Sequence, residues 1–133
     1  MKKLQTVMAV IELGAGVALL CCPSAAVALL LGSGLDAPAA VALGRVAGAA
    51  LLALGVACWL ARGDRESGAA RGVVTAMMVY NLGAVVILGT AGIRLRPVGV
   101  ALWPAVVLHA AMAGWCVECL RRRPTVKPSE QPT

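Results

Sequence analysis

The sequence predicts an all-α integral membrane protein built as a four-helix bundle, and three observations lead to this fold class. Of the 133 residues, 60% are hydrophobic and 14% are charged, whereas a soluble domain carries about 25% charged residues. A chain this short buries too little of its surface to hide that apolar surplus inside a core. The apolar residues also form continuous runs, which excludes the alternating strands of a membrane barrel and leaves the helix as the spanning structure.

Four apolar segments reach the length of about 20 residues that a membrane-spanning helix needs. They cover residues 4–22, 39–61, 73–92 and 98–120. We predict that residues 1–123 form a single transmembrane domain. Residues 124–133 are polar and rich in proline, which is typical of a disordered tail.

A shorter apolar segment, 23–31, lies between the first two predicted spans. Pro23 is suited to the first turn of a helix, because it has no N–H to leave unpaired there. The run is too short to cross a bilayer and is followed by Gly32-Ser33-Gly34. We therefore predict a short interfacial or re-entrant helix after the first span, with an extension of that span as the alternative.

Basic residues indicate how the spans are oriented, since Lys and Arg are enriched in cytoplasmic loops. If the N-terminus is cytoplasmic, nine of the twelve Lys and Arg lie on the inner side and three on the outer side. The outer three are Arg45, Arg94 and Arg96. We predict a multi-pass protein of the bacterial inner membrane with both termini in the cytoplasm.

The predicted partners follow from the charge and from the small residues. The net charge of +6 is placed at the ends of apolar runs and only 3% of residues are aromatic, so we predict no nucleic acid partner. Small residues let membrane helices approach closely. They recur as Gly44-x-x-x-Gly48 with Gly55, and as Gly14-x-x-x-Ala18 with Gly16 beside it. They favour a tight bundle in the lipid bilayer, or equally a homo-oligomer or a membrane protein partner.

Five polar residues inside the spans require an explanation, because polar groups at membrane depth are costly and often functional. They are Glu12, Arg45, Tyr80, Asn81 and His109. A rise of about 1.5 Å per residue places all but Arg45 near one depth. Arg45 lies nearer the outer face and either extends outward or reaches toward Glu12. The functional interpretation is a ligand-binding or proton-linked site, and the alternative is a set of hydrogen bonds that join the helices.

Cysteines suggest a third, weaker site. Cys116-Val117-Glu118-Cys119 places two thiols on one face of a helix, and Cys58 of the second span is a further candidate for a thiol or soft-metal site. Here the motif closes a helix, where the dipole does not favour a thiolate. Cysteine is also an ordinary packing residue in membranes.

Part of the chain resembles a family of small bacterial membrane proteins. The motif is LGRVAGAALLALG at 43–55 followed by WLAR at 59–62, after a first helix that ends at Pro23. The segments around Tyr80-Asn81 and 102–104 fit the same layout. The chain in this respect resembles the DoxX-like proteins and their uncharacterised four-helix relatives. The resemblance implies a four-helix bundle and, from some members, quinone-linked partners, but no assigned activity.

Together these patterns predict a non-enzymatic accessory or small-ligand-binding subunit. The alternative is a proton-coupled small-molecule carrier that uses Glu12, and a thiol or soft-metal protein is third. We predict no cofactor, with a quinone or a lipid as the ligands to be tested.

Overall fold

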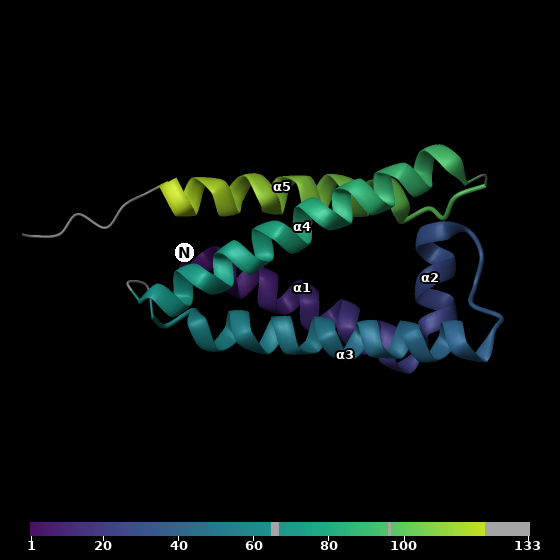
Figure 1. Ribbon diagram of the computed structural model, residues 1–133, viewed down its shortest axis with the longest axis horizontal. Coiled ribbons are helices and arrows are strands. Elements are labelled where there is room, and N and C mark those ends of the chain that lie inside the picture. The colour runs from purple at the N-terminus through teal and green to yellow at the C-terminus, as the bar shows by residue number, and fades with distance from the viewer. Residues whose placement is uncertain (65–66, 96, 122–133) are drawn as a thin grey trace, which may run out of the picture.

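The chain folds into five helices in a computed structural model that describes residues 1–64, 67–95 and 97–121, and these residues contain no strand (Figure 1). The helices are α1 (Lys2–Cys21), α2 (Pro23–Leu31), α3 (Pro38–Ala61), α4 (Gly68–Arg94) and α5 (Leu102–Arg121). By length and composition α1, α3, α4 and α5 are suited to cross a membrane. The predicted fold class, four spanning helices with a short helix after the first, is confirmed. The predicted tail, 124–133, lies outside the described residues.

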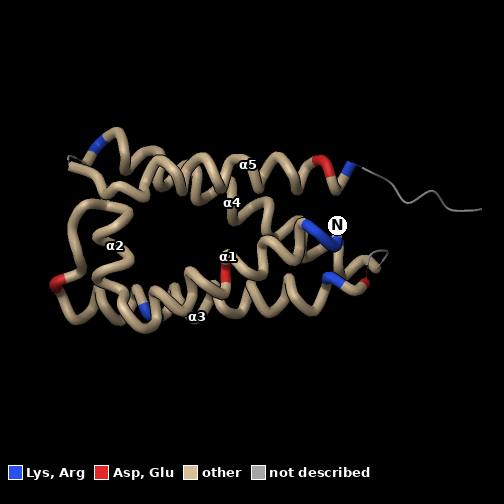
Figure 2. Tube along the Cα trace, turned by 180° about the vertical axis from the view of Figure 1, so that it is seen from behind, with Lys and Arg blue, Asp and Glu red and all other residues tan. Residues whose placement is uncertain are grey.

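The outer surface of the bundle is apolar, as a lipid-facing surface requires. Large hydrophobic side chains such as Leu43, Val86 and Val100 are 70%, 63% and 84% exposed. Most charged residues lie near the two ends of the bundle (Figure 2). This distribution fits helices that cross an apolar layer and keep their charges at its edges.

Helices α1 and α3 pack through glycines that bring their backbones together. A Cβ atom added to Gly16 would lie 2.8 Å from the Gly48 carbonyl oxygen, and one added to Gly48 would lie 2.8 Å from the Leu20 nitrogen. Gly55 continues the contact against Leu13. The predicted role of Gly48 and Gly55 is thus confirmed. On α1 the contact is made by Gly16 and not by Gly14, where an added Cβ would meet nothing within 4 Å.

Helices α4 and α5 form the second extensive pair, and α4 begins earlier than the predicted residue 73. The Ser67 hydroxyl accepts a hydrogen bond from the Ala70 N–H at 3.1 Å and so caps the helix start. Arg71 donates to the Leu120 carbonyl at 3.2 Å, which satisfies a free carbonyl in the last turn of α5. These two contacts position the start of α4 beside the end of α5.

Helix α2 lies across one end of the bundle and joins the two pairs (Figure 1). It begins with Pro23 and ends at Gly32, whose φ of 81° suits glycine. The Gly99 and Ala101 N–H groups donate to the Leu30 and Leu29 carbonyls at 3.1 and 2.9 Å. Because these residues form a loop bonded to α2, α5 starts at Leu102 and not at the predicted residue 98.

The main cluster of buried hydrophobic side chains lies in the half of the bundle that is remote from α2. All four long helices contribute to one cluster of buried side chains there. Its members are Leu4, Met8, Ala9, Cys58, Val74, Met77, Met112, Cys116 and Cys119. Toward α2 the α1–α3 and α4–α5 pairs diverge (Figure 1), and the candidate site lies where the packed half gives way to this open half.

Candidate functional site

His109 and Asn81 form the best-defined polar contact between helices. His109 Nδ1 lies 2.8 Å from Asn81 Oδ1 and joins α5 to α4. The Asn81 side-chain nitrogen donates to the Met77 carbonyl at 2.7 Å, which turns its oxygen toward the histidine. Because that oxygen has no proton to give, His109 Nδ1 carries the proton of this hydrogen bond. Asn81 therefore fixes both the orientation and the tautomer of His109.

Glu12 and Tyr80 form a second polar contact beside the first. The Glu12 side chain is only 3% exposed although it comes from the middle of α1. The Tyr80 hydroxyl hydrogen-bonds to the Glu12 carboxyl. The rings of Tyr80 and His109 meet edge to face with their centroids 5.6 Å apart. Four of the five predicted residues, Glu12, Tyr80, Asn81 and His109, are thus brought together from three helices.

A very small cavity lies among three of these polar groups. Its volume is about 10 Å³, and Glu12, Asn81 and His109 supply its polar lining. This is the space that about one water molecule needs, and water also needs two or more polar partners. The cavity is thus suited to one water that would link the Glu12 carboxyl to the Asn81–His109 pair.

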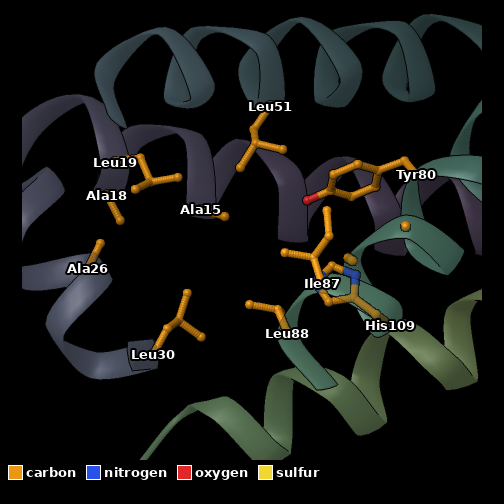
Figure 3. Close-up of a pocket in the computed structure, with 12 residues that line it drawn as sticks. Ala15, Ala18, Leu19, Ala26, Leu30, Leu51, Tyr80, Ile87, Leu88 and His109 are labelled. Carbon is orange, nitrogen blue, oxygen red and sulfur yellow. The ribbon is translucent and has the colours of Figure 1, made fainter. Parts of the chain in front are cut away.

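A much larger cavity adjoins the polar cluster on the side of α2. It has a volume of about 520 Å³, is partly open and has mostly apolar walls. All five helices contribute to it (Figure 3). The lining residues are Ala15, Ala18, Leu19, Ala26, Leu30, Leu51, Tyr80, Gly83, Ala84, Ile87, Leu88 and His109. Tyr80 and His109 are the polar side chains of this lining, and Figure 3 shows them together at one side of the cavity.

The structure does not bring Arg45 into this site. Its side chain is exposed on α3 and lines neither cavity. The predicted reach toward Glu12 is not seen, because Gly48 and Gly55 turn a different face of α3 toward α1. The other interpretation, that Arg45 extends toward the outer face, stays a prediction.

The three candidate metal or thiol residues lie in the packed core, away from the large cavity. Cys58, Cys116 and Cys119 are buried with free thiols. Within the described residues, no group of three or more His, Cys, Asp or Glu side chains is arranged to hold a metal ion. Their burial among Met8, Met77 and Met112 is that of packing residues.

Sequence reasoning missed two kinds of residue. Gln5 is fully buried, and its side-chain oxygen is enclosed without a hydrogen-bond partner. Gly83 and Ala84 line the large cavity from α4. They lie three and four residues after Tyr80, about one helical turn, and so share its face of the helix; this spacing was the available signal.

Comparison with known proteins adds no relative to this description. No protein-family model, curated protein or solved structure matches the chain. The fold and the site themselves define the class, a multi-pass helical membrane protein with an apolar cavity and a polar cluster at membrane depth.

Proposed function

We propose that this protein binds a lipophilic small molecule in the large cavity, as a non-enzymatic accessory or ligand-binding subunit. The observation that carries the proposal is the cavity itself. Its volume of about 520 Å³ falls within the range of about 300–1,000 Å³ that is usual for small-molecule sites. Apolar walls with a few convergent polar groups are also the usual composition of such sites.

The position of the cavity favours a ligand that arrives from the bilayer. It is partly open and lies between the α1–α3 and α4–α5 pairs, within the span of the apolar helices. A quinone or a lipid is of suitable polarity, and the resemblance to DoxX-like proteins points to the former. We place the protein in a bacterial inner membrane with both termini in the cytoplasm, in accordance with its basic residues.

Gly83 offers a direct test, because its side of α4 faces empty space within the cavity. An added Cβ at Gly83 would meet nothing within 4 Å, so Gly83→Leu is expected to fill the cavity without displacing a helix. Native mass spectrometry of the gently solubilised protein, with solvent extraction of the same sample, should detect a bound lipophilic molecule in the wild type. We expect its occupancy to fall at least about tenfold in Gly83→Leu, since a leucine occupies the space that the ligand needs.

The matched control is Gly89→Leu on the same helix. Gly89 also has nothing within 4 Å of an added Cβ, but it does not line the cavity. Occupancy should be unchanged in this variant. A wild-type protein without any bound molecule, or equal occupancy in both variants, contradicts the proposal.

A proton-coupled carrier is the second candidate function, and the water-sized cavity favours it. That cavity would connect Glu12 to His109, which also lines the large cavity. In this hypothesis Glu12 exchanges a proton as the ligand enters or leaves.

Glu12→Gln separates the carrier from a purely structural role for the carboxyl. Glutamine keeps the shape and an acceptor oxygen for Tyr80 but does not titrate. For a carrier, proton flux into proteoliposomes on addition of the extracted ligand should be lost, with the unfolding temperature changed by only a few degrees. Unchanged proton flux excludes the carrier. Glu12→Leu is the structural control. It should lower the free energy of unfolding by about 1–3 kcal/mol, because Tyr80 loses its acceptor.

The proposed homo-oligomer or membrane protein partner would need close-approach sites on the outer surface. Gly14 and Gly114 face outward, with nothing within 4 Å of an added Cβ. Such positions admit another helix. They support the role of an accessory subunit.

A further inference from the structure

The hydrogen bonds behind the cavity wall determine which polar atoms a ligand meets there. Asn81 does not line the large cavity, whereas His109 does. Since His109 Nδ1 is directed to Asn81, the opposite ring edge, with Nε2, is the polar edge left for a ligand. Among the described residues, the one enclosed side-chain nitrogen or oxygen without a partner is in Gln5. Because His109 Nε2 is not one of these enclosed atoms, it is accessible.

The tautomer makes Nε2 a hydrogen-bond acceptor. A neutral imidazole has one N–H, and here that proton is on Nδ1 because Asn81 presents its oxygen. Burial among apolar side chains favours the neutral over the charged ring. A ligand at this position therefore meets a lone pair and not an N–H.

Tyr80 presents the same polarity. The Tyr80 hydroxyl is paired with the Glu12 carboxyl. An ionised carboxyl can only accept, so in that state the hydroxyl proton of Tyr80 is directed to Glu12. What remains for the cavity is a lone pair on the phenolic oxygen. Figure 3 shows Tyr80 extending from α4 toward α1 and His109 approaching from α5. His109 is thus an acceptor through its bond to Asn81, and Tyr80 is one as well when Glu12 is ionised.

From this arrangement we propose that the ligand is a lipophilic molecule that donates a hydrogen bond, namely an alcohol or a phenol, with its hydroxyl against His109 and Tyr80. This inference rests on the proposed function and specifies the ligand class of the same site. It disfavours a quinone, whose carbonyls only accept hydrogen bonds, and favours a hydroxyl-bearing molecule such as a quinol. An ether or a carbonyl at this position would face two acceptors and leave them unpaired.

The test is a competition between matched probes in one sample. 1-Dodecanol and 1-methoxydodecane differ by one methyl group that replaces the donor proton, and they are distinguished by mass in native mass spectrometry. We expect the alcohol to occupy the delipidated wild-type protein about tenfold more than the ether, the effect of about one net hydrogen bond. A second arm compares 4-nonylphenol with 4-nonylanisole and shows whether a phenol or an aliphatic alcohol is the better donor.

Asn81→Leu tests the origin of the preference. Asn81 lies outside the cavity lining, so the cavity keeps its volume, but His109 is then free to carry its proton on either nitrogen. The ratio of alcohol to ether should fall toward one. Tyr80→Phe, which removes the second acceptor, should lower the ratio in part and serves if Asn81→Leu does not fold.

The outcomes separate the two proposals. A preference for both hydroxyl probes that weakens in the variants supports the inference. Binding of alcohol and ether with equal occupancy, or a preference for the ether, overturns it while leaving a ligand-binding cavity. Binding of neither pair, together with an empty protein on purification, overturns the proposed function as well.

Discussion

Gly99→Ala is expected to detach α2 from the loop that precedes α5. A Cβ at this position would overlap the carbonyl oxygen and carbon of Leu29. Both are backbone atoms, which cannot rotate away as a side chain does. The loop must move, and the bonds from Gly99 and Ala101 to α2 are then lost. We expect the free energy of unfolding to fall by about 2–4 kcal/mol, because two hydrogen bonds are lost and the added methyl group overlaps the backbone.

Hydrogen exchange measures this effect at the residues concerned. The amides of residues 99 and 101 should lose protection, while those of the α1–α3 pair should keep it. Because α2 contributes Ala26 and Leu30 to the cavity wall, ligand occupancy should also fall. Gly114→Ala is the control, since Gly114 has open space around it. Unchanged protection in Gly99→Ala would contradict the described docking of α2.

Gly48→Leu is expected to separate α1 from α3 and to have the larger effect on global stability. The Cβ alone would lie 2.8 Å from the Leu20 nitrogen and 2.9 Å from the Gly16 carbonyl oxygen, and the rest of the leucine has no space between the helices. In a membrane, close backbone approach is the main source of helix association. We expect the free energy of unfolding to fall by at least about 3 kcal/mol.

Thermal unfolding in detergent micelles measures this loss. Gly48→Leu should lower the unfolding temperature by many degrees, whereas Gly14→Leu on the outer face of α1 should change it little. If Gly48→Leu and Gly14→Leu unfold at the same temperature, α1 and α3 do not pack through this glycine. Gly48→Ala should give an intermediate result, because only the Cβ must then be accommodated.

The spans were predictable because hydrophobic length is a local property. Runs of about 20 apolar residues have one stable form in lipid, and their number and order were therefore correct. The positions of the helix ends, in contrast, depend on contacts outside the apolar runs. Helix α5 begins at Leu102 because Gly99 and Ala101 donate to α2, a contact between segments far apart in the sequence. The early start of α4 has a local cause, the Ser67 cap, but Ser67 lies before the apolar run from which the span was predicted.

The polar cluster was predictable from depth but its arrangement was not. Counting residues along the spans placed Glu12, Asn81 and His109 at one level, and the structure joins Asn81 to His109. The Glu12 carboxyl is paired with Tyr80, a partner that depth alone did not single out. The depth of a residue does not reveal how its helix is rotated about its own axis. Depth therefore did not show that the Arg45 side chain is exposed. It also did not show that Gly16, and not Gly14, contacts α3.

The cavity itself had no signature in the sequence. It forms where two helix pairs diverge, and its walls come from small or ordinary apolar residues of every helix. Small residues in a sequence look alike in both situations. Gly48 allows a close helix contact, whereas Gly83 borders an empty space.

The pairing of α1 with α3 and of α4 with α5 also has a consequence for biosynthesis. A chain is made from its N-terminus, at about 5–20 residues per second. Helices α1 and α3 are therefore complete, and their glycine contact available, before α4 leaves the ribosome. Each pair has its own interface, and the cavity exists only after the second pair docks on the first. We therefore expect assembly to proceed by halves, with the large cavity as the last part to form.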